Sequence, residues 1–145
     1  MSGLDEEGIR QTLARYCQLC DDGRFEEFAA LWTDEAVFSV PGRDAVVGRG
    51  AIRAFMEKAQ PPERRGKHMC SNSIIDVQGD EARVVSDYVF VAGPGGAYTI
   101  TSAGRYHDRI VRDPETGDWH FAQRRIEFAK RLAAEAQPFG YEAPG

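Results

Sequence analysis

The spacing of hydrophobic residues changes from a helical period in the first half of the chain to an alternating period in the second. From residue 5 to residue 21, apolar side chains recur at every third or fourth position, which is typical of one face of an α-helix. Asp22 and Gly23 then predict a stop and a turn. The same helical period returns over about 25–32 and again over 48–59. The first half therefore predicts about three helices.

A short strand is predicted over 36–40, and four longer alternating stretches follow the last helix. These four predicted strands cover 67–77, 81–92, 98–112 and 119–128. The connections between them are short and rich in Gly, Pro and Asp, as in hairpins. Helices followed by a meander of strands predict an α+β fold. Long strands must twist, so we expect a cone-shaped molecule whose helices pack in a strongly curved mixed or antiparallel sheet and enclose a pocket.

Length and charge restrict the classes of function. The 145 residues suit one domain, with a core over about 5–128 and an irregular tail rich in Pro and Gly over 136–145. The net charge of −5 and the scattered basic residues argue against nucleic-acid binding. No apolar run is long enough for a membrane span, and the acidic start lacks the apolar core of a signal peptide. We therefore expect a cytoplasmic protein, in which the three cysteines form no disulfide framework.

Asp21 and His68 form the sharpest candidate for chemistry. Asp21 ends the first predicted helix beside its apolar stripe, and an unpaired carboxylate there would be costly to bury. His68 opens the first long strand, whereas His107 and His120 stand among charged residues and are expected to be exposed. A histidine held by a carboxylate is a good general base near neutral pH. The simpler alternatives are a solvated helix end for Asp21 and a structural role for His68.

The remaining polar candidates are less specific. Arg124 and Arg125 are neighbours on the last predicted strand, so one faces the pocket and the other faces away. A pocket arginine could stabilise developing negative charge. Cys17 and Cys20 have the spacing of two small core residues on a helix, and no second cysteine pair supports a metal site. Ser102 has no visible base beside it, which argues against a nucleophilic role.

Taken together, several short motifs resemble the SnoaL-like superfamily, also called the nuclear-transport-factor-2-like fold. They are I-x6-Y-x4-D-x-G at 9–23, F-x2-L-W-T-D-E-A-V-F at 28–38, G-R-G-A-I at 48–52, H-x3-N at 68–72, G-R-Y-H-D at 104–108 and W-x-F-x2-R-R-I at 119–126. Within that superfamily, the chain is most similar to the subgroup of scytalone dehydratase, bile-acid 7α-dehydratase and hexachlorocyclohexane dehydrochlorinase. Members of this subgroup place an aspartate at the end of the first helix and a histidine at the head of the first long strand.

The resemblance implies a role for each matching residue. Asp21 would orient His68, and His68 would remove a proton from the substrate. Tyr16 would assist a leaving group, and Arg124 would be the pocket arginine on the last strand. Asn72 falls where the subgroup often has a polar pocket residue.

Four further residues complete the expected pocket. Trp32, Phe55 and Tyr88 are expected to contact the substrate, and Asp87 could be an additional acid unless Tyr88 faces inward in its place. No metal or organic cofactor is implied. The resemblance favours a cofactor-independent lyase, a dehydratase or a related β-eliminating enzyme, acting on a small polycyclic, alicyclic or aromatic molecule.

Two alternatives stay open: a non-catalytic ligand-binding or dioxygenase-small-subunit-like module, and a ketosteroid-isomerase-like isomerase. A homo-oligomer, either a trimer or a dimer, is expected in each case.

Overall fold

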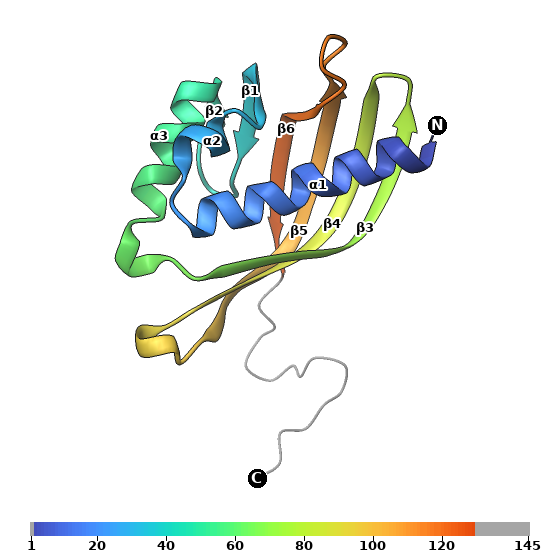
Figure 1. Cartoon of the computed structure of the whole chain (residues 1–145). Coiled ribbons are helices and arrows are strands. Elements are labelled where there is room, and N and C mark those ends of the chain that lie inside the picture. The colour runs from blue at the N-terminus through green and yellow to red at the C-terminus, as the bar shows by residue number, and fades with distance from the viewer. Residues whose placement is uncertain (1, 130–145) are drawn as a thin grey trace.

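The computed structural model describes residues 2–129, in which the helices lie along one face of a curved sheet (Figure 1). The helices are α1 (Ser2–Asp21), α2 (Phe25–Ala29) and α3 (Arg49–Ala59). Two short 3₁₀ turns occur at Pro62–Arg64 and Pro94–Gly96. α1 crosses the longer strands, while α2 and α3 cover the end of the sheet that carries β1 and β2. The expected α+β architecture is confirmed, and the predicted tail at 136–145 lies outside the described residues.

Six strands form one mixed sheet that does not close into a barrel, in the order β2-β1-β6-β5-β4-β3. The strands are β1 (Trp32–Ser39), β2 (Val46–Val47), β3 (Lys67–Gln78), β4 (Glu81–Ala92), β5 (Thr99–Arg112) and β6 (Trp119–Phe128). β1 pairs in parallel with β6, whereas the other neighbours are antiparallel. The four long strands match their predicted bounds within one residue at each end.

Irregularities in the strand pairing bend the sheet toward the helices. The register shifts once between β3 and β4, once between β4 and β5, and once between β5 and β6. An extra residue in one strand of a pair bends that strand and increases its twist. The bends let the long strands curve around α1, which gives the sheet the concave face that the sequence predicted.

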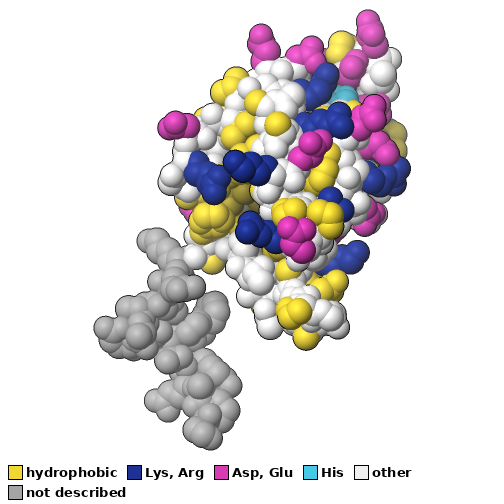
Figure 2. All heavy atoms as spheres, turned by 90° about the vertical axis from the view of Figure 1, so that its left-hand side faces the viewer, with side chains coloured by type: hydrophobic (Ala, Val, Ile, Leu, Met, Phe, Trp, Pro, Cys, Tyr) yellow, Lys and Arg dark blue, Asp and Glu magenta, His cyan; other side chains and the backbone are white. Residues whose placement is uncertain are grey.

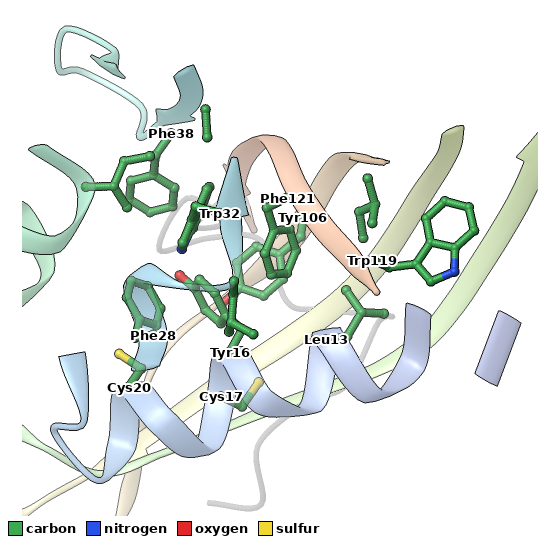
Figure 3. Packing of buried hydrophobic residues seen from close by; sticks show 14 of the residues in the cluster. Leu13, Tyr16, Cys17, Cys20, Phe28, Trp32, Phe38, Tyr106, Trp119 and Phe121 are labelled. Carbon is green, nitrogen blue, oxygen red and sulfur yellow. The ribbon is translucent and has the colours of Figure 1, made fainter. Parts of the chain in front are cut away.

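The core lies between α1 and the concave face of the sheet (Figure 3). Tyr16 stands at its centre, with ring centroids 5.1 Å from Phe28, 6.2 Å from Trp32 and 5.7 Å from Phe121. Such tilted and edge-on aromatic pairs add stabilisation beyond the area that they bury. The apolar stripe of α1 that the sequence predicted consists of buried residues: Ile9, Leu13, Tyr16, Cys17 and Cys20. Leu13, Tyr16, Cys17 and Cys20 point from α1 toward the sheet.

The structure corrects the predicted boundary between the second helix and the first strand. α2 ends at Ala29, and β1 begins at Trp32 instead of residue 36. Trp32 follows Phe25 and Phe28 at helical spacing, yet it pairs with Phe121 of β6 and belongs to the sheet. Parallel pairing with β6 is a long-range contact, so the local period could not predict it. In the described part of the chain, no helix is long and apolar enough to cross a membrane.

Candidate functional site

The end of α1 is fixed by a Schellman motif, which places Asp21 beside the sheet. The N–H of Arg24 donates to the carbonyl of Leu19 at 2.9 Å, and the N–H of Gly23 donates to the carbonyl of Cys20 at 3.1 Å. Gly23 has φ +70°, a conformation that disfavours other residues, and a Cβ there would collide with the Arg65 guanidinium. The turn leaves Asp21 as the last residue of the helix. A carboxylate is unfavourable at this end of a helix dipole, so it needs local donors.

His68 supplies those donors from the start of β3. Its ring nitrogen Nδ1 lies 2.6 Å from Asp21 Oδ1, and its backbone N–H donates to both carboxylate oxygens at 3.0 and 3.1 Å. The two side chains are only 9% and 4% exposed, respectively. Water therefore competes little for this contact. The structure brings the two residues together as the sequence predicted, although they lie 47 positions apart.

Neighbouring rings hold the imidazole of His68 in place. Its centroid lies 4.3 Å from that of Phe90 on β4, which is directly opposite in the strand register. Tyr16 meets it edge-on at 6.3 Å. A carboxylate on Nδ1 favours the tautomer with its proton there, which leaves the Nε2 lone pair free to accept a proton. No hydrogen-bond partner for Nε2 occurs among residues 2–129.

His68 also lines a cavity of about 380 Å³ between the sheet, α3 and the β1–β2 loop. Its lining is mostly apolar and aromatic, with a few polar side chains among them. The apolar members include Phe38, Val40, Phe55, Met56, Phe90, Ile126 and Phe128, and the polar members are Tyr16, Arg43, Gln60, His68, Tyr88, Ser102 and Tyr106. Small-molecule sites have this composition, in which apolar walls provide binding and a few polar groups fix orientation.

Tyr88 and Ser102 form a pair of hydroxyls in the cavity wall, which we call the hydroxyl pair. Their oxygens lie 2.9 Å apart. The Tyr88 ring stacks on Tyr106 with centroids 4.3 Å apart and planes 6° from parallel. Burial raises the pKa of Tyr88 above its ordinary value, so the phenol keeps its proton at neutral pH. The sequence predicted that Tyr88 lies in the pocket. It did not predict that Ser102 lies beside it, because their contact depends on the pairing of β4 with β5.

Arg124 does not line the cavity, which corrects its expected position. The side chain is fully buried and pairs with Asp108 through Nε to Oδ1 at 2.8 Å and Nη2 to Oδ2 at 2.9 Å. Its guanidinium carbon lies 3.7 Å from the Tyr106 centroid and 4.2 Å from that of Tyr16. Those two rings line the cavity, so Arg124 packs behind them. Burial raises the pKa of Tyr16 above its ordinary value, and the nearby guanidinium only partly offsets that effect.

Three other predicted residues also lie outside the cavity. Trp32 is completely buried in the core, one layer deeper than the lining. Asn72 sits at the irregularity in β3 with φ +53°, is exposed, and donates from Nδ2 to Asp87 Oδ2 at 3.1 Å. It also borders a groove between α1 and β3, which His68 lines as well. Asp87 points to the outer face of the sheet, where Arg105 Nε donates to it at 2.8 Å. The alternation along β4 turns Tyr88 inward instead, and Phe55 and Tyr88 line the cavity as expected.

The surroundings of the other two histidines, and of Cys17 and Cys20, do not suit them to catalysis. His107 and His120, expected to be exposed, are both half-buried, and Nδ1 of His120 lies 3.1 Å from the carbonyl oxygen of Ala30, just after α2. Burial raises the pKa of Cys17 and of Cys20 to about 12, which makes both poor nucleophiles near neutral pH. Within residues 2–129, no cluster of three or more His, Cys, Asp or Glu side chains is arranged to hold a metal ion.

Comparison with solved structures finds the same fold in several other proteins. Rv3472 from Mycobacterium tuberculosis, a protein of unknown function, is 27% identical, with a TM-score of 0.83 over 90% of this chain and 75% of that one. An NTF2-like protein with a cystatin-like fold from Novosphingobium aromaticivorans is 25% identical, with a TM-score of 0.79 over 90% of this chain and 85% of that one. A protein from Catenulispora acidiphila, solved in complex with S-DNPA, is 25% identical, with a TM-score of 0.78 over 88% and 95%.

The sequence itself matches one domain family over most of its length. No curated protein matches the chain significantly. The SnoaL-like domain family, however, matches residues 2–125, which include α1, the whole sheet up to Arg125 and both members of the Asp21–His68 pair. The family match and the shared fold agree, and the chain belongs to the SnoaL-like domain family.

Proposed function

We propose that the protein is a cofactor-independent lyase, a dehydratase or a related β-eliminating enzyme acting on a small cyclic substrate. One observation carries the proposal: the 2.6 Å contact between Asp21 Oδ1 and His68 Nδ1, at the wall of a cavity large enough for a small molecule. A base oriented by a carboxylate inside an apolar cavity is suited to removing a proton from carbon. The family alone does not specify this activity, because one fold carries many functions.

His68 acts as the base through Nε2. Asp21 accepts the Nδ1–H hydrogen bond, and its negative charge stabilises the imidazolium that forms when Nε2 takes a proton. The backbone N–H of His68 holds the carboxylate in place at 3.0 Å. As the C–H bond breaks, its electron pair forms the new double bond and expels the leaving group on the neighbouring carbon. General-base catalysis of this kind contributes roughly 10²–10⁴-fold.

The hydroxyl pair is suited to holding the leaving oxygen. A phenol and an alcohol that already share one hydrogen bond keep a donor for a third oxygen. In a dehydration, the imidazolium of His68 then gives the proton taken from carbon to the departing hydroxide, which leaves as water. The base is thereby regenerated, and no other group needs to change its protonation state.

The two alternative functions have less support from the geometry. A ketosteroid-isomerase-like mechanism uses a carboxylate base on the sheet. Among residues 2–129, the cavity lining contains no Asp or Glu, since Asp108 is paired with Arg124 and Asp87 faces outward. A purely ligand-binding module requires no contact between Asp21 and His68. The complex of the Catenulispora relative with S-DNPA is consistent with ligand binding in either case.

The test is a screen of cyclic β-hydroxy ketones for loss of water, followed by the absorbance of the conjugated product. We expect His68→Ala and Asp21→Asn each to lower turnover at least about 100-fold, which is the smaller end of the usual contribution of a general base. Asp22→Asn is the matched control, because Asp22 is the adjacent acid and is exposed. Circular dichroism verifies that each variant is folded. Turnover retained by His68→Ala or Asp21→Asn would contradict the mechanism, and saturable binding without product would favour the binding module.

A further inference from the structure

Arg43 is the one permanent cation in the lining of the cavity, among the residues that the structure describes. It lies in the loop between β1 and β2, and it also lines the shallow hollow just outside, next to Asp44 and Phe55. Its guanidinium carbon lies 5.6 Å from the centroid of the Phe55 ring, which itself lines the cavity. The side chain is exposed, so Arg43 stands where the cavity opens to solvent.

The guanidinium of Arg43 has no acidic partner within residues 2–129. Other arginines near this end of the molecule are neutralised: Arg49 pairs with Asp34 at 2.7 Å and Arg53 pairs with Glu57 at 2.7 Å. None of the ion pairs found in the described chain includes Arg43, although Asp44 is its neighbour in sequence. Its planar donors are therefore available, and a guanidinium binds carboxylates through two parallel hydrogen bonds.

The stretch of sequence that carries Arg43 and α3 is basic, although the whole protein is acidic. Residues 41–67 contain seven Lys or Arg residues and three Asp or Glu residues, in a chain of net charge −5. On the face of the molecule formed by α3 and the β4–β5 hairpin, basic side chains flank a hydrophobic area (Figure 2). A cleft with one sign of charge at its entrance concentrates ligands of the opposite sign.

The interior of the cavity is different, because its polar groups near the sheet are His68, the tyrosines and Ser102, none of which is a permanent cation. A ligand with one negatively charged end would keep that end at the opening and place its apolar ring inside. We propose that the substrate is a cyclic molecule with a carboxylate group and that Arg43 is the residue that selects it. This inference rests on the proposed function only in taking the same cavity as the substrate site.

Binding of two probes of nearly equal shape tests the inference. Calorimetry of 2-naphthoate and 2-naphthamide at pH 7.5 and low salt compares a carboxylate with a neutral amide on the same ring. We expect the wild-type protein to bind the carboxylate about tenfold more tightly, which is the usual scale of one charge-assisted hydrogen bond. Arg43→Gln should remove that preference and leave the affinity for the amide unchanged within about twofold.

Arg53→Gln is the matched control, because it removes the same charge from α3, where the ion pair of Arg53 within residues 2–129 is with Glu57. The preference for the carboxylate should persist in Arg53→Gln and also in His68→Ala, since binding at the opening does not require the base. Equal affinities for the two probes, no binding of 2-naphthoate, or an equal loss in Arg53→Gln would overturn the inference. The proposed function is tested separately by measuring turnover. A failure of carboxylate selection by Arg43 is therefore distinguishable from a failure of base catalysis by His68.

Discussion

Two buried pairs of an acid and a base lie close to the same cavity, and they differ in what they can do. Asp21 binds His68 at the cavity wall, and Asp108 binds Arg124 one layer deeper. An imidazole can act as a proton acceptor and donor, whereas a guanidinium stays charged. The first pair reaches the cavity, and the second is fully buried. Similar residue types therefore give a candidate base in one place and a structural cross-link in the other.

The largest expected effect is on stability and comes from breaking the deeper pair. Asp108→Ala leaves Arg124 buried without its partner, so we expect the free energy of unfolding to fall by about 3–5 kcal/mol. Urea unfolding measures this loss. Asp21→Asn keeps one acceptor oxygen for His68 and leaves no buried charge unpaired, so it should cost much less.

A double variant separates the lost pair from a general disruption of the core. Asp108→Leu combined with Arg124→Met replaces both charges with apolar groups, and it should be more stable than Asp108→Ala. If Asp21→Asn destabilised the protein more than Asp108→Ala, the contrast between a structural pair and a functional pair would be wrong.

A smaller effect is expected from the thiols on the face of α1 between the two pairs. Burial raises the pKa of Cys17 and Cys20 to about 12, above the ordinary value of 9.0. Between these two pH values the unfolded chain releases thiol protons that the folded chain retains, so stability must fall as pH rises. We expect a loss on the order of 1 kcal/mol per thiol by pH 10. Urea unfolding at pH 8 and pH 10 should show a shallower decline in the Cys17→Ala, Cys20→Ala double variant, and equal slopes would argue against buried thiols.

The smallest effect on turnover and stability is expected at Asp87, which was a candidate for an additional acid in the sequence analysis. Asp87 faces the outer side of the sheet, and its partners there are Arg105 and Asn72. Asp87→Asn should leave both turnover and the midpoint of urea unfolding within the scatter of repeat measurements. If Asp87→Asn clearly lost turnover while Asp22→Asn kept the turnover of the wild-type protein, the outer face of the sheet would take part in the reaction.

Local periodicity predicted most of the fold, because each long strand has one face toward the helices. β4, for example, alternates buried and less buried residues from Ala82 to Tyr88. The parallel pairing of β1 with β6 was missed because its partners, such as Val37 and Gln123, are far apart in sequence. The strand β2 was missed because its two residues are too few to show an alternating pattern. Trp32 shows the limit: its spacing from Phe28 fits a helix, but its contact with Phe121 places it in a strand.

The site was only partly predictable, for a related reason. The position of Asp21 at the end of α1 and the family motifs predicted that Asp21 and His68 form a pair, and the structure places them in contact. The depth of a side chain depends on how strongly the sheet curves, which no local pattern gives. Arg124 was therefore expected one layer too far out. Ser102 on β5 and Arg43 in the β1–β2 loop also line the cavity. Their positions depend on the folded structure, so the sequence did not predict them as site residues.

The protonation state of His68 tests the central claim most directly. In ¹⁵N-labelled protein, at a pH where the imidazole is neutral, NMR distinguishes a protonated Nδ1 from a protonated Nε2. The account predicts a proton on Nδ1, shared with Asp21, and a lone pair on Nε2, with loss of this preference in Asp21→Ala. A neutral imidazole with its proton on Nε2 in the wild-type protein would contradict the assignment of His68 as the base.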